Sequence, residues 1–497
     1  MARRLLILTL AFAGPPLAAG ELPADLDAIV AKSLAAWKAP GLAVAVVKGD
    51  DTVLLKGYGV TRQGEPGAVT PKTLFPMGSC TKALTSALLA SLADDGKLTL
   101  DDPVRKHLPD FRLNDPAADA KAKLRDLMCH RTGTAAHDYL WYRAPWGRAE
   151  VIRRARYLPG AYPFRGGYEY SSVMVMAAGQ AAANAGGASW EDLVRDRLTT
   201  PLGMSDTVLT SAAAAKVPGR AAGHRLTDAG TVEAMPEYVL TEANPAGSAF
   251  TTATDAVNWL HFQLDGGRFA GKRVVSAANL RETQTAQTPM PRTDPEIAAV
   301  YPDSVKVDYA LGWVVYDYRG REVVAHGGVT DGFRTLFLMV PKERVGVALF
   351  NNLHQTKMNL AVAHALLDRL MGDPPARDWD AYYLKLEATE RADKAAAEAA
   401  RDAARDPAAK PSAALERYAG SYEHPAYGPA AVTLVGGALH WKWSGFTGAL
   451  TPYEGDTFRV SDGPLTGRLV EFRNRTGTPD ALRAVGAVFE RKASQER

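Results

Sequence analysis

The chain is poor in cysteine, with only Cys80 and Cys129 among its 497 residues. Two cysteines cannot supply the framework of a small disulfide-rich protein. An oxidising compartment would allow one bridge between them. Two separate buried thiols fit the sequence equally well, because the distance between them cannot be read from it. The sequence leaves both alternatives open.

The chain also has little net charge. It contains 58 lysine and arginine residues against 55 aspartate and glutamate residues, a formal net charge of +3. Two of the basic residues, Arg3 and Arg4, lie in an N-terminal leader, and without them the charges nearly cancel. A near-neutral chain gives no electrostatic reason to bind nucleic acid or an anionic membrane surface.

Several functional motifs are missing as well. Beyond residue 20 no apolar run reaches the roughly 18 residues of a membrane-spanning helix, so we expect no stable membrane anchor. Neither H-E-x-x-H nor H-x-H-x-D occurs, and the G-x-S-x-G elbow of the α/β-hydrolases is absent. The sequence therefore predicts no catalytic metal and no other cofactor.

The first 20 residues have the three-part pattern of a secretory signal peptide. Arg3 and Arg4 precede an apolar stretch over residues 5–13, and small residues follow up to Gly20. Two prolines in between would break a buried helix. No cysteine follows the apolar stretch, so a lipid anchor is not expected. We expect residues 1–20 to be removed and the protein to be exported, to the periplasm or the extracellular space.

Residues 21–372 alternate between helical and strand patterns. Apolar spacing and turn residues predict helices over 22–39, 80–93, 172–184, 255–264 and 358–371, a hairpin around 49–51, and strands within 309–328 and 333–352. The order places strands at both ends of a long helical insertion. An antiparallel sheet built from both ends, with helices packed on its faces, is the natural arrangement, which is an α+β fold.

The remainder of the chain divides into two further segments. Residues 373–410 are rich in alanine, glutamate and arginine, with charges at helical spacing, and predict a solvated connecting helix. Residues 411–497 contain short alternating runs broken by glycine, which is typical of a small all-β barrel or sandwich. Trp441 and Trp443 alternate about Lys442, so they line either an interface or the interior of a barrel.

A short motif, Ser79-Cys80-Thr81-Lys82, lies at the start of the predicted helix 80–93. A serine at this point usually caps backbone N–H groups. It can also be a nucleophile, because the positive end of the helix favours an alkoxide and Lys82 lies one turn later on the same face. A lysine in a closed site loses solvation, so its pKa falls and it can accept the serine proton. Alone, the motif is weak evidence.

Two further segments carry residues suited to the same chemistry. Tyr170 ends an extended stretch, and a nearby lysine charge would make its hydroxyl more acidic, so that it could act as general base and then as acid. His326 ends a predicted strand and precedes Gly327 and Gly328, which let a substrate approach the backbone closely. Each has a structural alternative, a packed ring for Tyr170 and a strand-end histidine for His326.

Together the three segments resemble the serine β-lactamase and penicillin-binding-protein superfamily, in particular its class C-like branch of D-aminopeptidases, esterases and LACTB-type proteases. In that branch the motifs are S-x-x-K, Y-x-N and, in place of the lysine-containing K-T-G, H-x-G, and they correspond here to residues 79–82, 170–172 and 326–328. The accessory segments "LRDLMCHRTGT", "LTTPLGMSDT", "AGSAFTTATDAVNWL" and "YALGW" match in the same order. The resemblance covers roughly residues 25–370, and ordered co-occurrence is more specific than one motif.

The resemblance implies a role for each matching residue. Ser79 would attack the substrate carbonyl, and Lys82 and Tyr170 would share the proton transfers. The backbone N–H groups of Ser79 and Val329 would form the oxyanion hole. His326 would take the place of the third-motif lysine, beside the carboxylate or leaving group of the substrate.

Two positions depart from the relatives or lie at the margin of the site. Ser172 stands where the branch has asparagine, and a serine makes fewer hydrogen bonds, so substrate orientation is affected more than activation of the nucleophile. A histidine at 326 holds a carboxylate less firmly than a lysine, because it is mostly neutral above its ordinary pKa. His130 and His137 lie in a segment that the resemblance places at the rim.

The resemblance also implies the domain types. Residues 21–372 would form a β-lactamase/transpeptidase-like domain, and residues 411–497 are similar to the lipocalin-like domain often appended to such hydrolases. In those relatives this domain covers the active-site entrance or mediates oligomers, so a homo-oligomer formed through it is one expectation.

The leading hypothesis is a secreted serine hydrolase that acts through an acyl-enzyme on an amide or ester. Peptide-like substrates, including those with D-residues, are favoured over β-lactams because the third motif lacks its lysine. A small-ester esterase and a β-lactamase are alternatives on the same site. A catalytically silent binder of cell-wall fragments is a different class: the altered Ser172 favours it, and the intact Ser79, Lys82 and Tyr170 argue against it.

Overall fold

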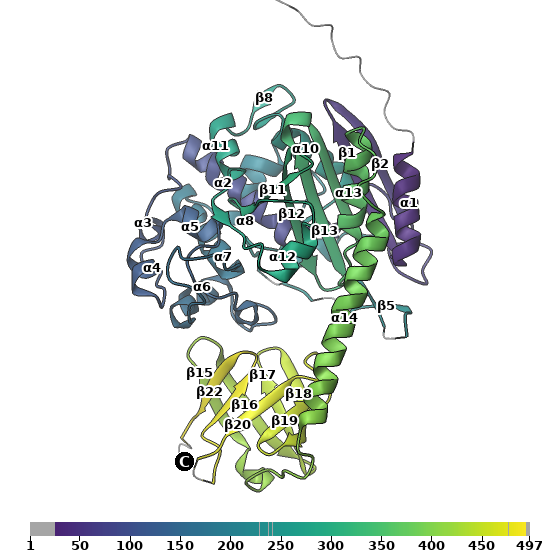
Figure 1. The fold of residues 1–497 in the computed structure, drawn as a ribbon. Helices are drawn as coiled ribbons and strands as arrows, with labels where there is room; N and C mark the ends of the chain where they lie inside the picture. Colours follow the sequence, from purple (N-terminus) through teal and green to yellow (C-terminus); the bar gives the residue numbers. More distant parts are fainter. Residues whose placement is uncertain (1–24, 228, 237, 241, 476, 494–497) are drawn as a thin grey trace, which may run out of the picture.

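The computed structural model describes residues 25–493 except residues 228, 237, 241 and 476. The signal peptide predicted over residues 1–20 lies outside the described residues. The chain forms an α+β part and a barrel, and the long helix α14 (Trp379–Ala404) runs from one to the other (Figure 1). The predicted fold class is confirmed.

Eight antiparallel strands form the main sheet, in the order β2-β1-β14-β13-β12-β11-β10-β9. Their bounds are β1 Gly41–Lys48, β2 Asp51–Gly59, β9 Thr288–Pro289, β10 Val307–Tyr309, β11 Val314–Tyr318, β12 Arg321–Thr330, β13 Phe333–Val340 and β14 Val345–Asn351. Val44 of β1 lies opposite Leu349 of β14. The sheet is therefore built from both ends of the segment, as the sequence predicts.

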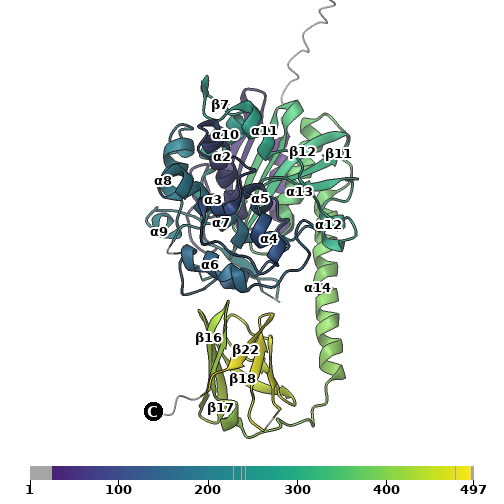
Figure 2. The same ribbon diagram turned by 90° about the vertical axis from the view of Figure 1, so that its left-hand side faces the viewer.

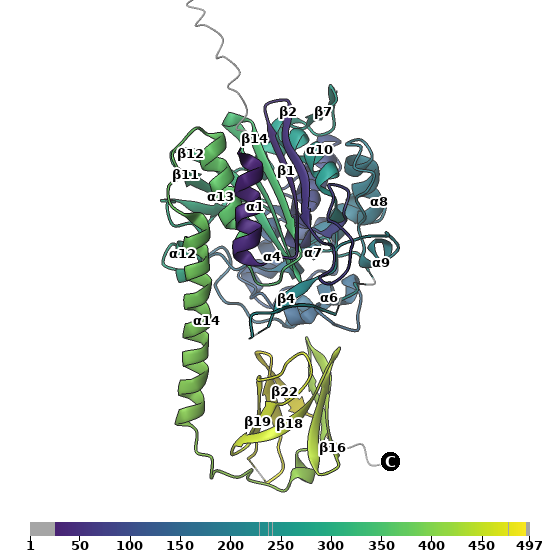
Figure 3. The same ribbon diagram turned by 90° about the vertical axis from the view of Figure 1, so that its right-hand side faces the viewer.

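Helices cover both faces of this sheet. The larger ones are α1 Leu26–Trp37, α2 Thr81–Asp94, α7 Ser172–Gly186, α10 Ala253–Leu264 and α13 Met358–Leu370, close to the ranges predicted from the sequence. Figure 3 shows α1 and α13 on one face, and Figure 2 shows α2 and α7 on the opposite side. Successive side chains of β1 point to opposite faces, so Val44 packs with the first group and Ala45 with the second.

Shorter elements complete the α+β part. They are α3 Val104–His107, α4 Pro116–Lys121, α5 Leu124–Met128, α6 Arg148–Arg154, α8 Trp190–Val194, α9 Ser211–Ala214, α11 Ala277–Thr283 and α12 Pro295–Val300, with the strand pairs β3 Phe75–Pro76 and β6 Phe250–Thr251, β4 His224–Leu226 and β5 Val232–Ala234, and β7 Arg268–Phe269 and β8 Lys272–Arg273. Most of them lie in the insertion between β2 and β9.

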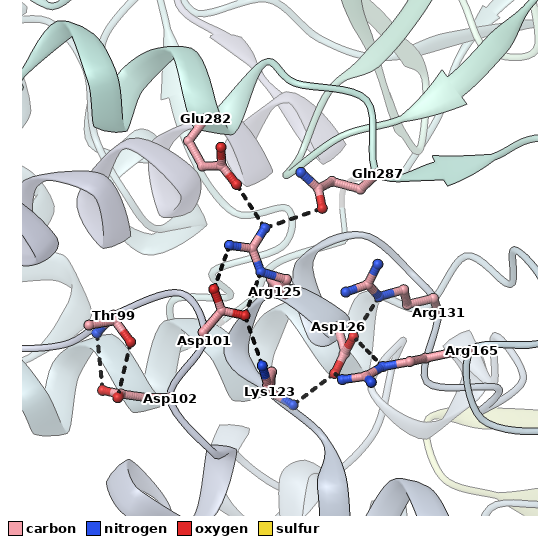
Figure 4. A network of polar contacts seen from close by, with 10 residues as sticks. All are labelled: Thr99, Asp101, Asp102, Lys123, Arg125, Asp126, Arg131, Arg165, Glu282 and Gln287. Carbon is pink, nitrogen blue, oxygen red and sulfur yellow. Dashed lines mark hydrogen bonds and ion pairs between the residues drawn. The ribbon is translucent and has the colours of Figure 1, made fainter.

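A buried carboxylate ties this insertion together. Asp126 in α5 is fully buried and accepts hydrogen bonds from the Lys123 backbone N–H at 2.9 Å, from Arg131 Nε at 2.5 Å, and from Arg165 at 2.8 and 3.1 Å (Figure 4). Burial alone would raise the pKa of Asp126, but these donors, Arg165 foremost, lower it below its ordinary value. The carboxylate stays charged and joins α5 to residues 131 and 165.

The same junction fixes the approach to Tyr170. The Arg165 backbone N–H donates to the Arg131 carbonyl at 2.9 Å, and the Glu169 N–H donates to the His130 carbonyl at 3.0 Å. The Ser171 N–H donates to His130 Nδ1 at 3.1 Å. Tyr170 is therefore held on both sides by the segment that Asp126 anchors.

The C-terminal part is a closed barrel in which each strand pairs with the next and β22 pairs with β15. Its strands are β15 Gly420–His424, β16 Gly428–Val435, β17 Ala438–Trp443, β18 Phe446–Glu454, β19 Thr457–Val460, β20 Leu469–Arg473, β21 Ala481–Ala484 and β22 Ala487–Arg491. Trp441 and Trp443 are buried, with ring centroids 6.1 Å apart, whereas Lys442 is exposed. The tryptophans fill the barrel interior, and Trp443 also lies against Tyr139 of the α+β part.

Helix α14 carries most of its side chains in solvent. Only Trp379, Asp380, Tyr383 and Glu387 are buried, all in its first turns, where Asp380 accepts a hydrogen bond from the Trp37 indole at 2.8 Å. Among the described residues, no helix combines the length and apolar character needed to cross a bilayer.

The two cysteines are buried and form no disulfide. Cys80 Sγ donates a hydrogen bond to the carbonyl of His326 at 3.1 Å, while burial raises the pKa of both thiols. Of the two alternatives that the sequence leaves open, the structure shows the separate buried thiols.

Replacing Asp126 by alanine is expected to lower the free energy of unfolding of the α+β part by about 1.5–3 kcal/mol, because the buried carboxylate and its charge-assisted hydrogen bonds with Lys123, Arg131 and Arg165 are lost. Asp101→Ala is the matched control. Asp101 also bonds an arginine, Arg125, but its side chain is 54% exposed, so we expect a loss of only about 0–1 kcal/mol (Figure 4). Urea unfolding followed by circular dichroism measures both, and equal losses would contradict the role given to burial.

Candidate active site

Two glycines bring Ser79 against strand β12. Ser79 lies in a short 3-10 turn just before α2, and Gly78 in that turn has φ +51°. A Cβ at Gly78 would lie 2.7 Å from the backbone nitrogen of Val329, and a Cβ at Gly328 would lie 1.9 Å from the Met77 carbonyl oxygen. Side chains at these two positions would push the strand and the turn apart. The close approach places the Val329 N–H beside the serine turn.

Lys82 points its amine at the serine from the first turn of α2. Its Nζ lies 3.1 Å from Ser79 Oγ, donates to the Ala246 carbonyl at 3.0 Å, and lies 4.6 Å from the centroid of the Tyr170 ring. The side chain is fully buried. Burial lowers the pKa of Lys82 to about 7, against the opposing effects of the charges of Asp138 and Cys80. The neutral amine is therefore well populated near pH 7 and can accept a proton.

Tyr170 also lies beside Ser79. Burial raises the pKa of its hydroxyl above the ordinary value, and a hydrogen bond with Ser79 lowers it by less. The shift is opposite to the effect expected from the sequence, because desolvation of the phenolate outweighs any help from Lys82. The resting hydroxyl is thus protonated and can donate a proton or relay one.

His326 forms part of the wall and uses both ring nitrogens within the protein. Nδ1 lies 2.7 Å from the Gly327 carbonyl oxygen, and Nε2 lies 2.8 Å from the Tyr309 hydroxyl. Because a carbonyl oxygen can only accept, Nδ1 carries the proton and Nε2 accepts from Tyr309. Burial, and next the charge of Lys82, lower the pKa of His326 to about 3. The ring is neutral and does not offer a substrate carboxylate a positive charge.

The residues at the third motif have two different roles: some line the cavity, and one packs against the serine turn. Gly327 and Val329 line the cavity, and the Val329 side chain is 55% exposed there. Gly328 packs against the serine turn instead. The N–H groups of Ser79 and Val329 therefore come from two segments that meet at the nucleophile, which is the arrangement that an oxyanion hole requires.

Ser172 begins α7 and is buried, and its hydroxyl forms a hydrogen bond with Asp138. Asp138 also accepts a hydrogen bond from the Trp141 indole N–H at 2.9 Å. Burial raises the pKa of Asp138, against opposing effects from Trp141, Lys82 and Ser172. Asp138 cannot be identified from the sequence, because an aspartate in an aromatic loop matches no motif and only the fold places it beside Lys82.

Other residues of the site also escaped the sequence analysis. Tyr309 donates a hydrogen bond to His326 Nε2, and the Ala246 carbonyl accepts from Lys82. Both belong to segments that match the family, "YALGW" and "AGSAF", so motif order could have indicated the segments but not the atoms.

The two histidines expected at the rim have different positions. The ring of His130 lies 4.4 Å from that of Tyr170 by centroid, and burial keeps its pKa well below the ordinary value. His130 therefore packs against the ring of Tyr170. His137 lies in the loop that faces the barrel, where its Nδ1 is 2.6 Å from the Tyr427 hydroxyl.

The barrel holds this loop from outside. Ser444 Oγ and the Gly445 N–H both donate to the Arg143 carbonyl, at 2.7 and 2.9 Å. The ring of Tyr139 lies 6.0 Å from Trp443 and 5.7 Å from Phe446, measured between centroids. The end of the barrel thus packs against the loop that contributes Asp138 to the cavity.

The cavity beside Ser79 has a volume of about 770 Å³. Its lining includes the serine itself, many aromatic rings and the three carboxylates of Asp138, Glu296 and Asp331. This size suits a peptide-like or drug-sized ligand.

Comparisons with known proteins agree with this geometry. Residues 26–370 match the beta-lactamase family, and residues 404–494 match a domain of unknown function, DUF3471. Unguisins hydrolase ungD' of Aspergillus campestris (strain IBT 28561) is 31% identical over 429 residues, which cover 82% of this chain and 77% of the relative.

Solved structures share the fold. The octameric penicillin-binding protein homologue from Pyrococcus abyssi superposes with a TM-score of 0.63 at 20% identity, over 92% of this chain and 97% of that one. D-amino acid amidase from Ochrobactrum anthropi SV3 superposes with a TM-score of 0.57 at 24% identity, over 70% and 98%. The family match, the identity to ungD' and the shared fold show that this chain belongs to the β-lactamase family of serine hydrolases.

Proposed function

We propose that the protein hydrolyses an amide or ester bond of peptide-like substrates, peptides with D-residues among them, through an acyl-enzyme on Ser79. The observation that carries the proposal is the buried Lys82 amine, 3.1 Å from Ser79 Oγ, with its pKa lowered to about 7. An amine with this pKa is a general base matched to neutral pH. The name of the relative ungD', a hydrolase, supports the same reaction type.

Acylation begins with attack of Ser79 Oγ on the substrate carbonyl carbon while the neutral Lys82 amine takes the hydroxyl proton. The negative charge that develops on the carbonyl oxygen is stabilised by the N–H groups of Ser79 and Val329. Tyr170 passes its hydroxyl proton to the leaving amine or alcohol and regains one from Lys82. The bond to the leaving group then breaks, and the acyl group remains on Ser79.

Deacylation reverses these proton transfers. The neutral amine of Lys82, directly or through Tyr170, takes a proton from a water molecule that attacks the ester carbonyl. The same two N–H groups stabilise the second oxyanion. Collapse of this intermediate returns a proton to Ser79 Oγ and releases the carboxylic acid, so the site is restored.

The binder hypothesis draws its support from the serine at position 172. In the structure the Ser172 hydroxyl is bonded to Asp138, so the second motif has a defined partner without the asparagine. A binder would have no need for a lysine desolvated beside a serine, because a buried amine costs stability. The geometry therefore favours turnover over silent binding.

A fluorophosphonate probe is expected to give a single covalent adduct, on Ser79, because phosphonylation requires an activated hydroxyl. Ser79→Ala should abolish the adduct. Ser86→Ala, a buried serine two turns further along α2, is the matched control and should keep it. Intact-mass spectrometry with peptide mapping measures the outcome. An unlabelled wild-type protein, or an adduct elsewhere, would argue against the proposed nucleophile.

Substitutions of Lys82 and Tyr170 should have different effects on the reaction rates. Lys82→Met is expected to slow probe acylation by roughly 100- to 10,000-fold, the usual contribution of a general base. Tyr170→Phe should slow hydrolysis of an amide much more than that of a p-nitrophenyl ester with the same acyl group, because only the amide leaving group needs a proton. Values of kcat/KM for the two substrates test this, and equal losses on both would exclude Tyr170 as the proton donor.

A further inference from the structure

The charge of the cavity wall has one sign. Asp138, Glu296 and Asp331 line the cavity, and among its described lining residues there is no lysine or arginine. Such a wall raises the local concentration of cations and repels anions. The neutral ring of His326 does not offset this charge. A substrate with a carboxylate near its scissile bond is therefore disfavoured.

Two of the three carboxylates have local explanations. Asp331 accepts a hydrogen bond from the Tyr142 hydroxyl at 2.6 Å and forms an ion pair with Arg143 at 3.4 Å. Glu296 lies in the first turn of α12, where the positive end of the helix favours an acidic side chain. Asp138 differs from both, because its hydrogen-bond donors, Trp141 and Ser172, are neutral.

Asp138 is reachable from the cavity although the protein surrounds it. Its side chain is exposed to solvent, yet the neighbouring atoms remove enough water to raise the pKa of the carboxyl group. Lys82 is the cation that interacts most strongly with Asp138. Its amine must be neutral to accept the serine proton. Once Lys82 is neutral, the described residues that act most strongly on the carboxylate supply no full positive charge, and a cationic ligand would supply one.

Aromatic rings line the same cavity. The cavity lining contains Tyr139, Trp141, Tyr142, Tyr168, Tyr238 and Phe333. The face of an aromatic ring attracts an ammonium group within about 6 Å of its centroid, and most strongly where water is excluded. Tyr142 and Tyr238 already bind a cation in this way, with the Arg143 guanidinium 5.3 and 5.2 Å from their ring centroids.

We propose that Asp138 binds an ammonium group of the substrate close to the scissile carbonyl, and that the enzyme therefore selects amides or esters with a free amino group over blocked or anionic ones. This inference rests on the proposed function of Ser79. Ser172 and Trp141 act as positioning residues, since their hydrogen bonds orient the carboxylate. Asp138 forms a binding site for the substrate and takes no part in the proton transfers.

Paired substrates test the selection directly. Aminoacyl p-nitroanilides of both configurations are compared, each with a free or an N-acetylated amino group, at pH 7. For the configuration that is hydrolysed, kcat/KM should be at least tenfold higher with the free amino group. Asp138→Asn should reduce this ratio by at least tenfold, and Asp138→Glu should retain part of it.

Asp331→Asn is the matched control. It also removes a carboxylate from this cavity, but Arg143 already neutralises the charge of that carboxylate. The ratio of free to acetylated substrate should be retained in this variant. A ratio that falls equally in both variants, or that stays unchanged in Asp138→Asn, would overturn the inference. Labelling of Ser79 by the fluorophosphonate in every variant shows that the site is intact, and its absence in the wild type would refute the proposed function instead.

The wild-type protein alone gives a second test that needs no variant. Phenethylamine and 3-phenylpropionate contain rings of the same size, but the two molecules carry opposite charges. The amine should inhibit hydrolysis competitively, at a concentration at least tenfold lower than the carboxylate. Inhibition by the carboxylate that equals or exceeds that by the amine would overturn the inference even if Asp138→Asn fails to fold.

Discussion

The site depends on one costly arrangement, an amine buried beside a hydroxyl. In water a lysine is protonated at neutral pH and cannot act as a base. In this protein α2 buries Lys82 completely, and the loss of solvation lowers its pKa to about 7. The amine keeps only a few polar contacts, Ser79 Oγ and the Ala246 carbonyl among them. The same desolvation that costs stability turns Lys82 into a base of the right strength.

The rest of the α+β part holds the groups around this amine. The turn at residues 244–248 directs the Ala246 carbonyl at Lys82, and Asn244 Oδ1 fixes that turn by accepting from the Ala246 N–H at 2.8 Å. Gly78 and Gly328 allow β12 to approach the serine turn. The buried Asp126 anchors the segment that ends at Tyr170. Each of these contacts joins residues far apart in the sequence, so the catalytic geometry exists only in the folded sheet.

The sequence predicts the parts of the site that follow from local rules. Ser79 and Lys82 lie one helical turn apart, so their proximity requires nothing beyond a helix. The alternation of β-branched residues and the turn residues predict the hairpin at the start of the sheet and the strands at its end. The ordered motifs predict that Tyr170 and His326 belong to the same site, because a resemblance carries the spatial arrangement of the fold with it.

What the sequence could not show depends on burial and on distant contacts. The motif pattern gives no sign that Asp138 reaches Ser172, since its loop is shaped by α7 and by the barrel. The direction of the pKa shift of Tyr170 follows from how much solvent the fold removes, and a charge argument from sequence alone gave the opposite sign. The state of the cysteines was open for the same reason: the distance between two thiols is a property of the fold.

Lys82 is the base that activates Ser79, and the pH dependence of Ser79 acylation tests this role most directly. The second-order rate of labelling by a neutral ester-type probe should rise as pH passes through about 7, the pKa of Lys82, and level off above about pH 8. His326, with its pKa lowered to about 3, and Tyr170, with its pKa raised, should add no step between pH 5 and 9. A rate that keeps rising toward pH 10, where an ordinary lysine loses its proton, would contradict the account.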